Sequence, residues 1–143
     1  MKALLSFLIA GVMAAIIVNN LSDSTGLRYT AELMKMSTVP DDTPLKRRRA
    51  IFDPRLHRMA YGVIVAMEAI TAALCAVGGW LLLQGDRRGV MITRVGLGMG
   101  LALFVGIFRG VGQWFLSWRG QFNGLADTSQ LALVMLGMLG VIK

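Results

Sequence analysis

The chain has 143 residues, of which 55% are hydrophobic and 16% are charged, and this composition excludes a disordered chain and is typical of a membrane protein. A single cysteine and a single histidine exclude a disulfide framework, a zinc site built on cysteine pairs and bis-histidine haem ligation within one chain. The formal net charge of +7 comes mainly from one polar segment between apolar stretches. Basic segments next to membrane helices contact lipid phosphates or set topology, so we expect no binding to nucleic acid.

The first predicted transmembrane helix covers residues 3–21. Its apolar run is broken only by Ser6 and closes at Asn19 and Asn20. About 19 residues suffice to cross about 30 Å of hydrocarbon. A basic start before an apolar centre is also typical of a signal peptide, but no clean small-x-small cleavage site follows, so we expect a retained span.

Residues 22–58 form a long polar loop with two predicted short helices. The first covers residues 27–36 and is stopped by Pro40. The second covers residues 45–52 and carries Arg47, Arg48 and Arg49, which we expect to meet anionic lipid headgroups. A solvated loop is the alternative for this second segment, and both interpretations stay open.

Three further spans are predicted at residues 59–83, 90–115 and 125–142, with a tight polar turn at residues 84–89. Asp53 followed by Pro54 is a cap-and-proline start for the second span. The third span contains two pairs of glycines at the spacing that lets helices approach closely, Gly96–Gly100 and Gly106–Gly110. The sequence therefore predicts an all-α, polytopic protein with four transmembrane helices in one membrane domain, residues 1–143.

Aromatic and basic residues indicate how these spans sit in the membrane. Trp80 falls at one end of the predicted bundle, and Trp114 and Trp118 fall at the other, as in an interfacial belt. Four spans place both termini on the same side. The count of basic residues places the first and third loops in the cytoplasm, whereas a short Lys-bearing N-terminus argues for the reverse, so the orientation stays open.

Two ionisable residues, Glu68 and Arg109, lie inside predicted spans, where an unpaired charge is costly. Counted from the turn at residues 84–89, they stand at heights of about 24 and about 30 Å, one helical turn apart. We predict that they meet as a buried ion pair that fixes the register of two helices, with a proton or anion relay as the alternative. If Arg109 instead anchors at the interface, Glu68 needs Asn19 or Asn20 as its partner. The predicted intramembrane polar cluster, which we interpret as structural, comprises Asn19, Asn20, Glu68, Arg109 and Gln113.

His57 is the weak candidate for a cofactor ligand. It precedes the second span and could bind a quinone headgroup or one haem iron. A lone histidine at an interface is usually solvated, which is our expectation, and we predict no cofactor. The chain has no catalytic triad, nucleotide loop or metal-ligand cluster, so we expect no enzymatic activity.

Short motifs in a fixed order give a resemblance over nearly the whole chain. They are Asn19-Asn20-Leu21-Ser22-Asp23, Arg49-Ala50-Ile51, Leu56-His57, Tyr61, Glu68, Gly112-Gln113-Trp114-Phe115, Trp118 and Asn123-Gly124. In this order the chain resembles a bacterial family of predicted small integral membrane proteins of unknown function. The resemblance implies a four-span protein of the bacterial inner membrane and supplies no activity. The family generally has Glu where this chain has Gln113.

Small size, close-packing glycines and the lack of a catalytic set favour one functional hypothesis. The protein is expected to be a non-enzymatic accessory or scaffold subunit of a larger inner-membrane complex, respiratory or photosynthetic, with other membrane subunits as partners. The alternatives are a small carrier or proton conductor that uses Glu68 and Arg109, and a redox anchor that binds quinone or haem near His57.

Overall fold

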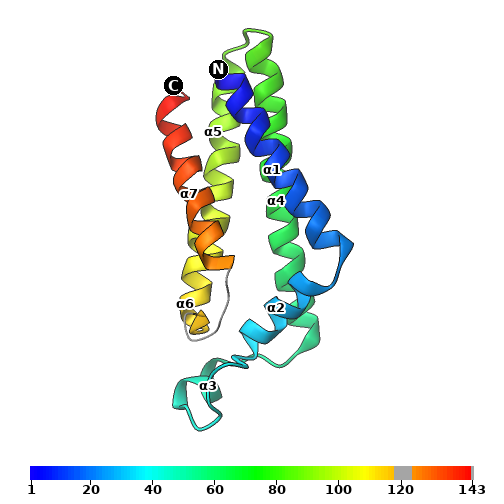
Figure 1. Ribbon diagram of the computed structural model, residues 1–143, viewed down its shortest axis with the longest axis vertical. Coiled ribbons are helices and arrows are strands. Elements are labelled where there is room, and N and C mark those ends of the chain that lie inside the picture. Colours follow the sequence, from blue (N-terminus) through cyan, green and yellow to red (C-terminus); the bar gives the residue numbers. More distant parts are fainter. Residues whose placement is uncertain (118–123, 143) are drawn as a thin grey trace.

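The computed structural model describes residues 1–117 and 124–142, without the side chains of residues 124–128. Every regular element in these ranges is a helix, as predicted (Figure 1). In chain order they are α1 (Lys2–Ser22), α2 (Thr25–Met34), α3 (Pro44–Arg49), α4 (Pro54–Leu83), α5 (Arg88–Leu101), the π-helix η1 (Ala102–Val111), α6 (Gly112–Trp114) and α7 (Gly124–Val141).

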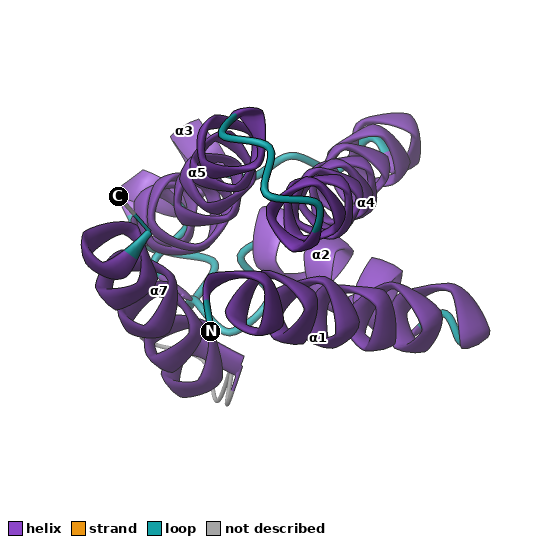
Figure 2. Ribbon diagram, turned by 90° about the horizontal axis from the view of Figure 1, so that it is seen from above, coloured by secondary structure: helices purple, strands orange, loops and turns teal. Residues whose placement is uncertain are grey.

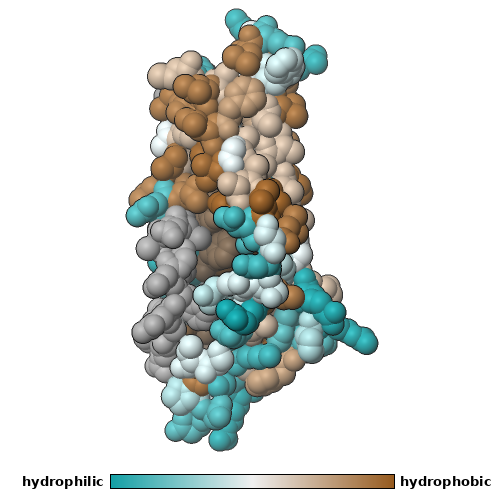
Figure 3. Space-filling model, turned by 45° about the vertical axis from the view of Figure 1, so that its right-hand side comes forward, coloured by the Kyte–Doolittle hydropathy of each residue, from teal (hydrophilic) through white to brown (hydrophobic). Residues whose placement is uncertain are grey.

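Three helices in the described part are long and apolar enough to cross a membrane. They are α1, α4 and the continuous helix Arg88–Trp114 formed by α5, η1 and α6, while Ser129–Val141 of α7 is a shorter apolar helix. On the face drawn in Figure 3, apolar side chains cover most of the upper part below a polar tip, and polar side chains gather at the lower end, where α2 and α3 lie in Figure 1. This division matches a membrane-embedded part and a polar part outside it.

Aspartate side chains accept backbone hydrogen bonds at the starts of two helices, and Asp53 is the one that the sequence predicts. Asp53 accepts a 2.8 Å hydrogen bond from the backbone N–H of Arg55, and Pro54 takes the first helical position, so α4 starts as predicted. The helix ends at Leu83. Asp23 accepts a 2.7 Å bond from the N–H of Thr25 at the start of α2. That helix is Thr25–Met34 rather than residues 27–36, and α3 is limited to Pro44–Arg49.

Helix α4 is the centre of the arrangement, with α1 on one side and α5 on the other. The turn between α4 and α5 is tight, and Gly85 adopts a left-handed conformation there with φ of 76°. Helix α7 packs on α5 and η1, so that α1, α4, α5 and α7 surround a common interior (Figure 2). The beginning of α1 and the end of α7 lie at the same end of the molecule (Figure 1).

The glycines of α4 and α5 permit a very close crossing of these two helices. A Cβ atom at Gly78 would stand 2.8 Å from the backbone nitrogen of Thr93, and one at Gly89 would stand 2.7 Å from the carbonyl oxygen of Gly78. Gly96 and Gly100 are also tightly packed, as the sequence predicts. Gly106 has no such neighbour within 4 Å among the described residues, so its predicted role in close packing within the chain is wrong.

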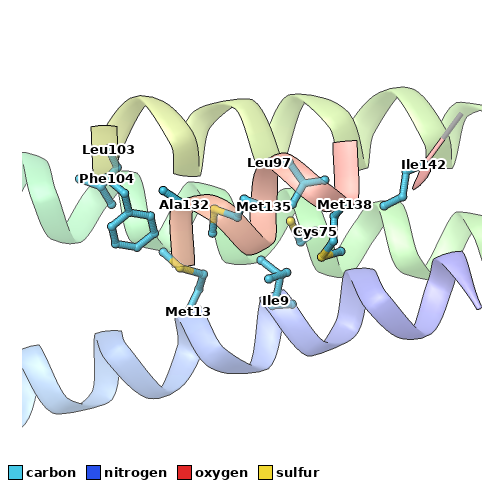
Figure 4. Close-up of a cluster of buried hydrophobic side chains, with 11 residues drawn as sticks. Ile9, Met13, Cys75, Leu97, Leu103, Phe104, Ala132, Met135, Met138 and Ile142 are labelled. Atoms are coloured by element: carbon cyan, nitrogen blue, oxygen red, sulfur yellow. The ribbon is translucent and has the colours of Figure 1, made fainter. Parts of the chain in front are cut away.

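Buried apolar side chains form two clusters. The larger lies between α1, α4, α5, η1 and α7 and includes Ile9, Met13, Cys75, Leu97 and Met135 (Figure 4). A second, smaller cluster joins the polar loop to the end of the third span; its buried members are Met34, Met36, Val39 and Phe115. The loop of residues 22–58 is therefore folded onto the helices.

The third span is not one regular α-helix. Its α-helical part ends at Leu101, and the next ten residues form the π-helix η1. A π-helix closes its hydrogen bonds one residue later than an α-helix, so it presents its side chains in different directions. This change matters for Arg109, which lies in the last turn of η1.

Candidate functional site

A buried carboxyl group on α4 is the centre of the candidate site. Glu68 lies midway along this helix, and only 2% of its surface is exposed. Asn20, in the last turn of α1, donates a 2.8 Å hydrogen bond from Nδ2 to Oε2 of Glu68. The Tyr61 hydroxyl, two turns before Glu68, donates a 2.5 Å bond to the backbone oxygen of Asn20. Two groups on α4 thus hold one residue of α1.

The inner face of α4 continues beyond Glu68 with small side chains. Thr71 and Cys75 follow at helical spacing and are fully buried. The Thr71 hydroxyl has no hydrogen-bond partner among the described residues, although a threonine in a helix usually bonds to the carbonyl four residues earlier. The Thr71 methyl group lies close to Gly100: a Cβ atom added at Gly100 would stand 3.2 Å from it. A buried hydroxyl therefore remains unpaired one turn from a buried carboxyl group.

Arg109 lies away from this site, and the predicted Glu68–Arg109 pair is wrong. Arg109 is exposed and donates a hydrogen bond to the Ser129 hydroxyl of α7. The prediction counted a regular α-helical rise through the whole third span, but η1 changes the direction of the residues near its end. The stated alternative, Asn20 as the partner of Glu68, is confirmed.

The remaining members of the predicted polar cluster do not join it. Asn19 and Gln113 are exposed, on α1 and α6 respectively. Of the five residues predicted to gather, the structure brings only Asn20 and Glu68 into contact.

His57 is buried rather than solvated, which corrects the prediction for this residue. Only 3% of its surface is exposed, and its Nε2 lies 2.8 Å from the carbonyl oxygen of Ile51. The end of the polar loop folds back over the start of α4, and the Ile51 N–H donates a 2.8 Å bond to the Met34 carbonyl oxygen. His57 therefore fastens this loop to α4.

The basic residues of α3 have different environments. Arg47 and Arg48 are exposed. Arg49 lies with its guanidinium carbon 4.2 Å from the centre of the Trp114 ring and donates a 3.1 Å bond to the Trp114 carbonyl oxygen. Lys46 forms a 2.8 Å ion pair with Asp41, and this hydrogen bond and charge lower the pKa of the Asp41 carboxyl. Of the three arginines of α3, Arg47 and Arg48 are thus the exposed ones, and their contact with lipid headgroups stays a prediction.

The tryptophans lie at opposite ends of the helices. Trp80 belongs to the last turn of α4 and is 58% exposed, while Trp114 closes the third span and is 55% exposed. Trp118 lies outside the described residues. Their place at the two interfaces of a bilayer stays a prediction.

Sequence analysis missed one polar contact entirely. The hydroxyls of Ser6 on α1 and Thr93 on α5 are 3.1 Å apart, and both residues are fully buried. The only polar residue in the first apolar run is Ser6, and this was the available signal. The bond from Tyr61 to the backbone of Asn20 was also not predicted, because it joins two helices that are far apart in the sequence.

The described residues contain no group of three potential metal-ligating side chains. The long apolar helices and their few buried polar contacts define a small integral membrane protein. A comparison with protein families matches residues 1–143 to the predicted small integral membrane protein family (DUF2165), and the chain belongs to this family. No curated protein and no solved structure matches the chain.

Proposed function

We propose that this protein is a non-enzymatic accessory subunit that packs against helices of a larger complex in the bacterial inner membrane. One observation carries this proposal. Small, exposed residues occur at every fourth position between residues 98 and 110 of the third span: Gly98, Ala102, Gly106 and Gly110. Small residues at this spacing let a second membrane helix approach closely. The close-packing glycines inside the protein, such as Gly78, are a different set.

The proposal includes four membrane crossings, with α7 as the fourth. The 18 residues of α7 rise about 27 Å, close to the thickness of the hydrocarbon layer. Both chain ends then lie on one side of the membrane. Reporter fusions at Lys143 and in the turn that contains Gly85 should report the same compartment, and opposite compartments would contradict four crossings.

The structure bears differently on the two alternative functions. A relay through Glu68 and Arg109 needs these residues to meet, and each has another partner, Asn20 and Ser129. A redox anchor at His57 would have to use Nδ1, because Nε2 is engaged with the Ile51 carbonyl. The accessory role does not depend on either contact.

Copurification from native membranes tests the proposal. A tagged chain extracted in mild detergent should retain larger membrane proteins at fixed stoichiometry. Gly98→Leu and Gly106→Leu should each reduce this association, because the larger side chain separates the helices. Val95→Leu is the matched control, since Val95 is 54% exposed on the same helix and already bears a side chain. Recovery only as a free monomer or homo-oligomer would contradict the accessory role.

The exposed arginines Arg47 and Arg48 support a second contact, with anionic lipid headgroups. Replacing both with Gln should reduce retention of anionic lipid during purification, as measured by mass spectrometry of bound lipids. Arg49→Gln is the comparison, because Arg49 is engaged with Trp114. Equal loss of lipid in both variants would contradict a specific role for the exposed pair.

A further inference from the structure

We propose that Glu68 is a membrane-embedded proton-binding site that opens toward one side of the membrane only. This proton-binding site is independent of the accessory role, which concerns the outer face of the third span. The juxtaposition that carries it is a buried carboxyl group bound by Asn20, with an unpaired buried hydroxyl, Thr71, one turn along the same helix face.

The surroundings of the Glu68 carboxyl group favour its neutral form. Within the described residues the only ion pair is Lys46–Asp41, so no described cation neutralises Glu68. Asn20 donates one hydrogen bond, which is a neutral contact. A lone carboxylate out of water is costly. One proton added to one carboxylate oxygen gives a neutral carboxylic acid and removes that cost.

Charged groups on the neighbouring helices are directed elsewhere. Arg94 on α5 is exposed, and Arg109 on η1 is exposed and bonded to Ser129. Asp23, beyond the end of α1, is exposed, and so is Arg28 on α2. The other titratable groups on the buried side of α4 are His57, Tyr61 and Cys75. Tyr61 and Cys75 are neutral in their protonated forms. His57 lies three turns before Glu68, where its Nε2 contacts the Ile51 carbonyl oxygen.

Thr71 supplies a second hydrogen-bonding position for the bound proton. Residues three apart on a helix have Cβ atoms about 5–6 Å apart, within reach of a rotating glutamic acid side chain. The Thr71 hydroxyl is fully buried and has no other hydrogen-bond partner in the described part of the chain. A carboxylic O–H that turns toward it finds an acceptor, while the second carboxyl oxygen keeps the bond from Asn20.

Access is possible from the end of α1 and is closed beyond Thr71. Asn20 and Tyr61 are half-buried and lead from Glu68 toward the polar loop. In the other direction the described interior is filled by Met13, Leu97 and Met135, none of which has exposed surface (Figure 4). The site therefore exchanges protons with the side of the polar loop and does not conduct them across the membrane.

Labelling with dicyclohexylcarbodiimide tests the proposal on the full chain in membranes. This apolar reagent reacts with protonated carboxyl groups. We expect one equivalent of label on Glu68 by mass spectrometry, fading as pH rises, and no label in Glu68→Gln. Glu32→Gln is the matched control and should keep the label, since Glu32 lies on α2 in the polar loop. Label at Glu32 alone, or label on Glu68 that does not change with pH, would overturn the site.

Three further measurements test proton binding and one-sided access separately. Infrared spectroscopy of the unmodified protein should show a protonated carboxyl band that disappears at high pH, and its absence at every pH would overturn the proposal. Protection from labelling by sodium ions at constant pH would assign the site to a metal cation and overturn proton binding. Proteoliposomes should show no proton flux that depends on Glu68, and such a flux would overturn the closed side.

Discussion

Asn20 on α1 donates a 2.8 Å hydrogen bond to Glu68 on α4, across 48 residues of sequence. The bond joins the last turn of one membrane helix to the middle of another. Because the Tyr61 hydroxyl holds the backbone of the same asparagine, the end of α1 is fixed to α4 at two points. This contact sets where α1 lies relative to the rest of the protein.

Removing this contact should destabilise the protein. Asn20→Leu leaves the buried Glu68 carboxyl without its donor, which costs about 1–3 kcal/mol for a neutral buried group and more for a charged one. Unfolding of the purified protein in mixed micelles with increasing sodium dodecyl sulfate measures this change. Asn19→Leu is the matched control, because Asn19 is exposed on the neighbouring position. Equal stability of both variants and the parent would contradict a structural role for the bond.

The crossing of α4 and α5 should not accept a methyl group at Gly78. Gly78→Ala places a Cβ 2.8 Å from the backbone nitrogen of Thr93, and overpacking of this kind costs about 1–3 kcal/mol. Gly62→Ala on the same helix has nothing within 4 Å and should leave the stability equal or raise it by up to about 1 kcal/mol. The same micelle unfolding assay compares the two. A stable Gly78→Ala variant would contradict the close crossing.

Arg49 should hold the polar loop against the third span. Arg49→Ala removes the contact with the Trp114 ring, worth about 0.5–1 kcal/mol at an exposed site, and the bond to its carbonyl oxygen. We expect faster hydrogen exchange at the Ile51 amide, which bonds to Met34 in the same loop. Arg48→Ala, at an exposed position, should leave this exchange rate unchanged. Identical exchange in both variants would show that the loop is held by other contacts.

The Asp41–Lys46 pair should respond to acid. The pKa of Asp41 is lowered first by its hydrogen bond with Lys46 and then by the Lys46 charge. A lowered folded-state pKa means that the contribution to stability is present above the ordinary carboxyl pKa and is lost as pH falls through the folded-state value. Carbon-13 NMR titration of the Asp41 carboxyl should give a midpoint that rises in Lys46→Gln. An unchanged midpoint would contradict the pair.

The class of protein and most of its helices follow from local features of the amino-acid sequence. Apolar runs of sufficient length, together with caps such as Asp53 before Pro54, predict helices at the observed places. These signals are local, since hydropathy and capping depend on neighbouring residues. The order of short motifs also identified the family, which the match over residues 1–143 confirms.

Which polar groups meet follows from the packing of whole helices. Counting residues along regular helices placed Glu68 beside Arg109, whereas the π-helix η1 turns the side chains near the end of the third span in other directions, and Asn20 of α1 takes the position beside Glu68. His57 became buried for a similar reason, because the loop folds back to its side chain. A contact between distant residues depends on how whole helices rotate and cross. Close packing at glycines such as Gly78 determines this crossing, and a local sequence pattern does not predict it.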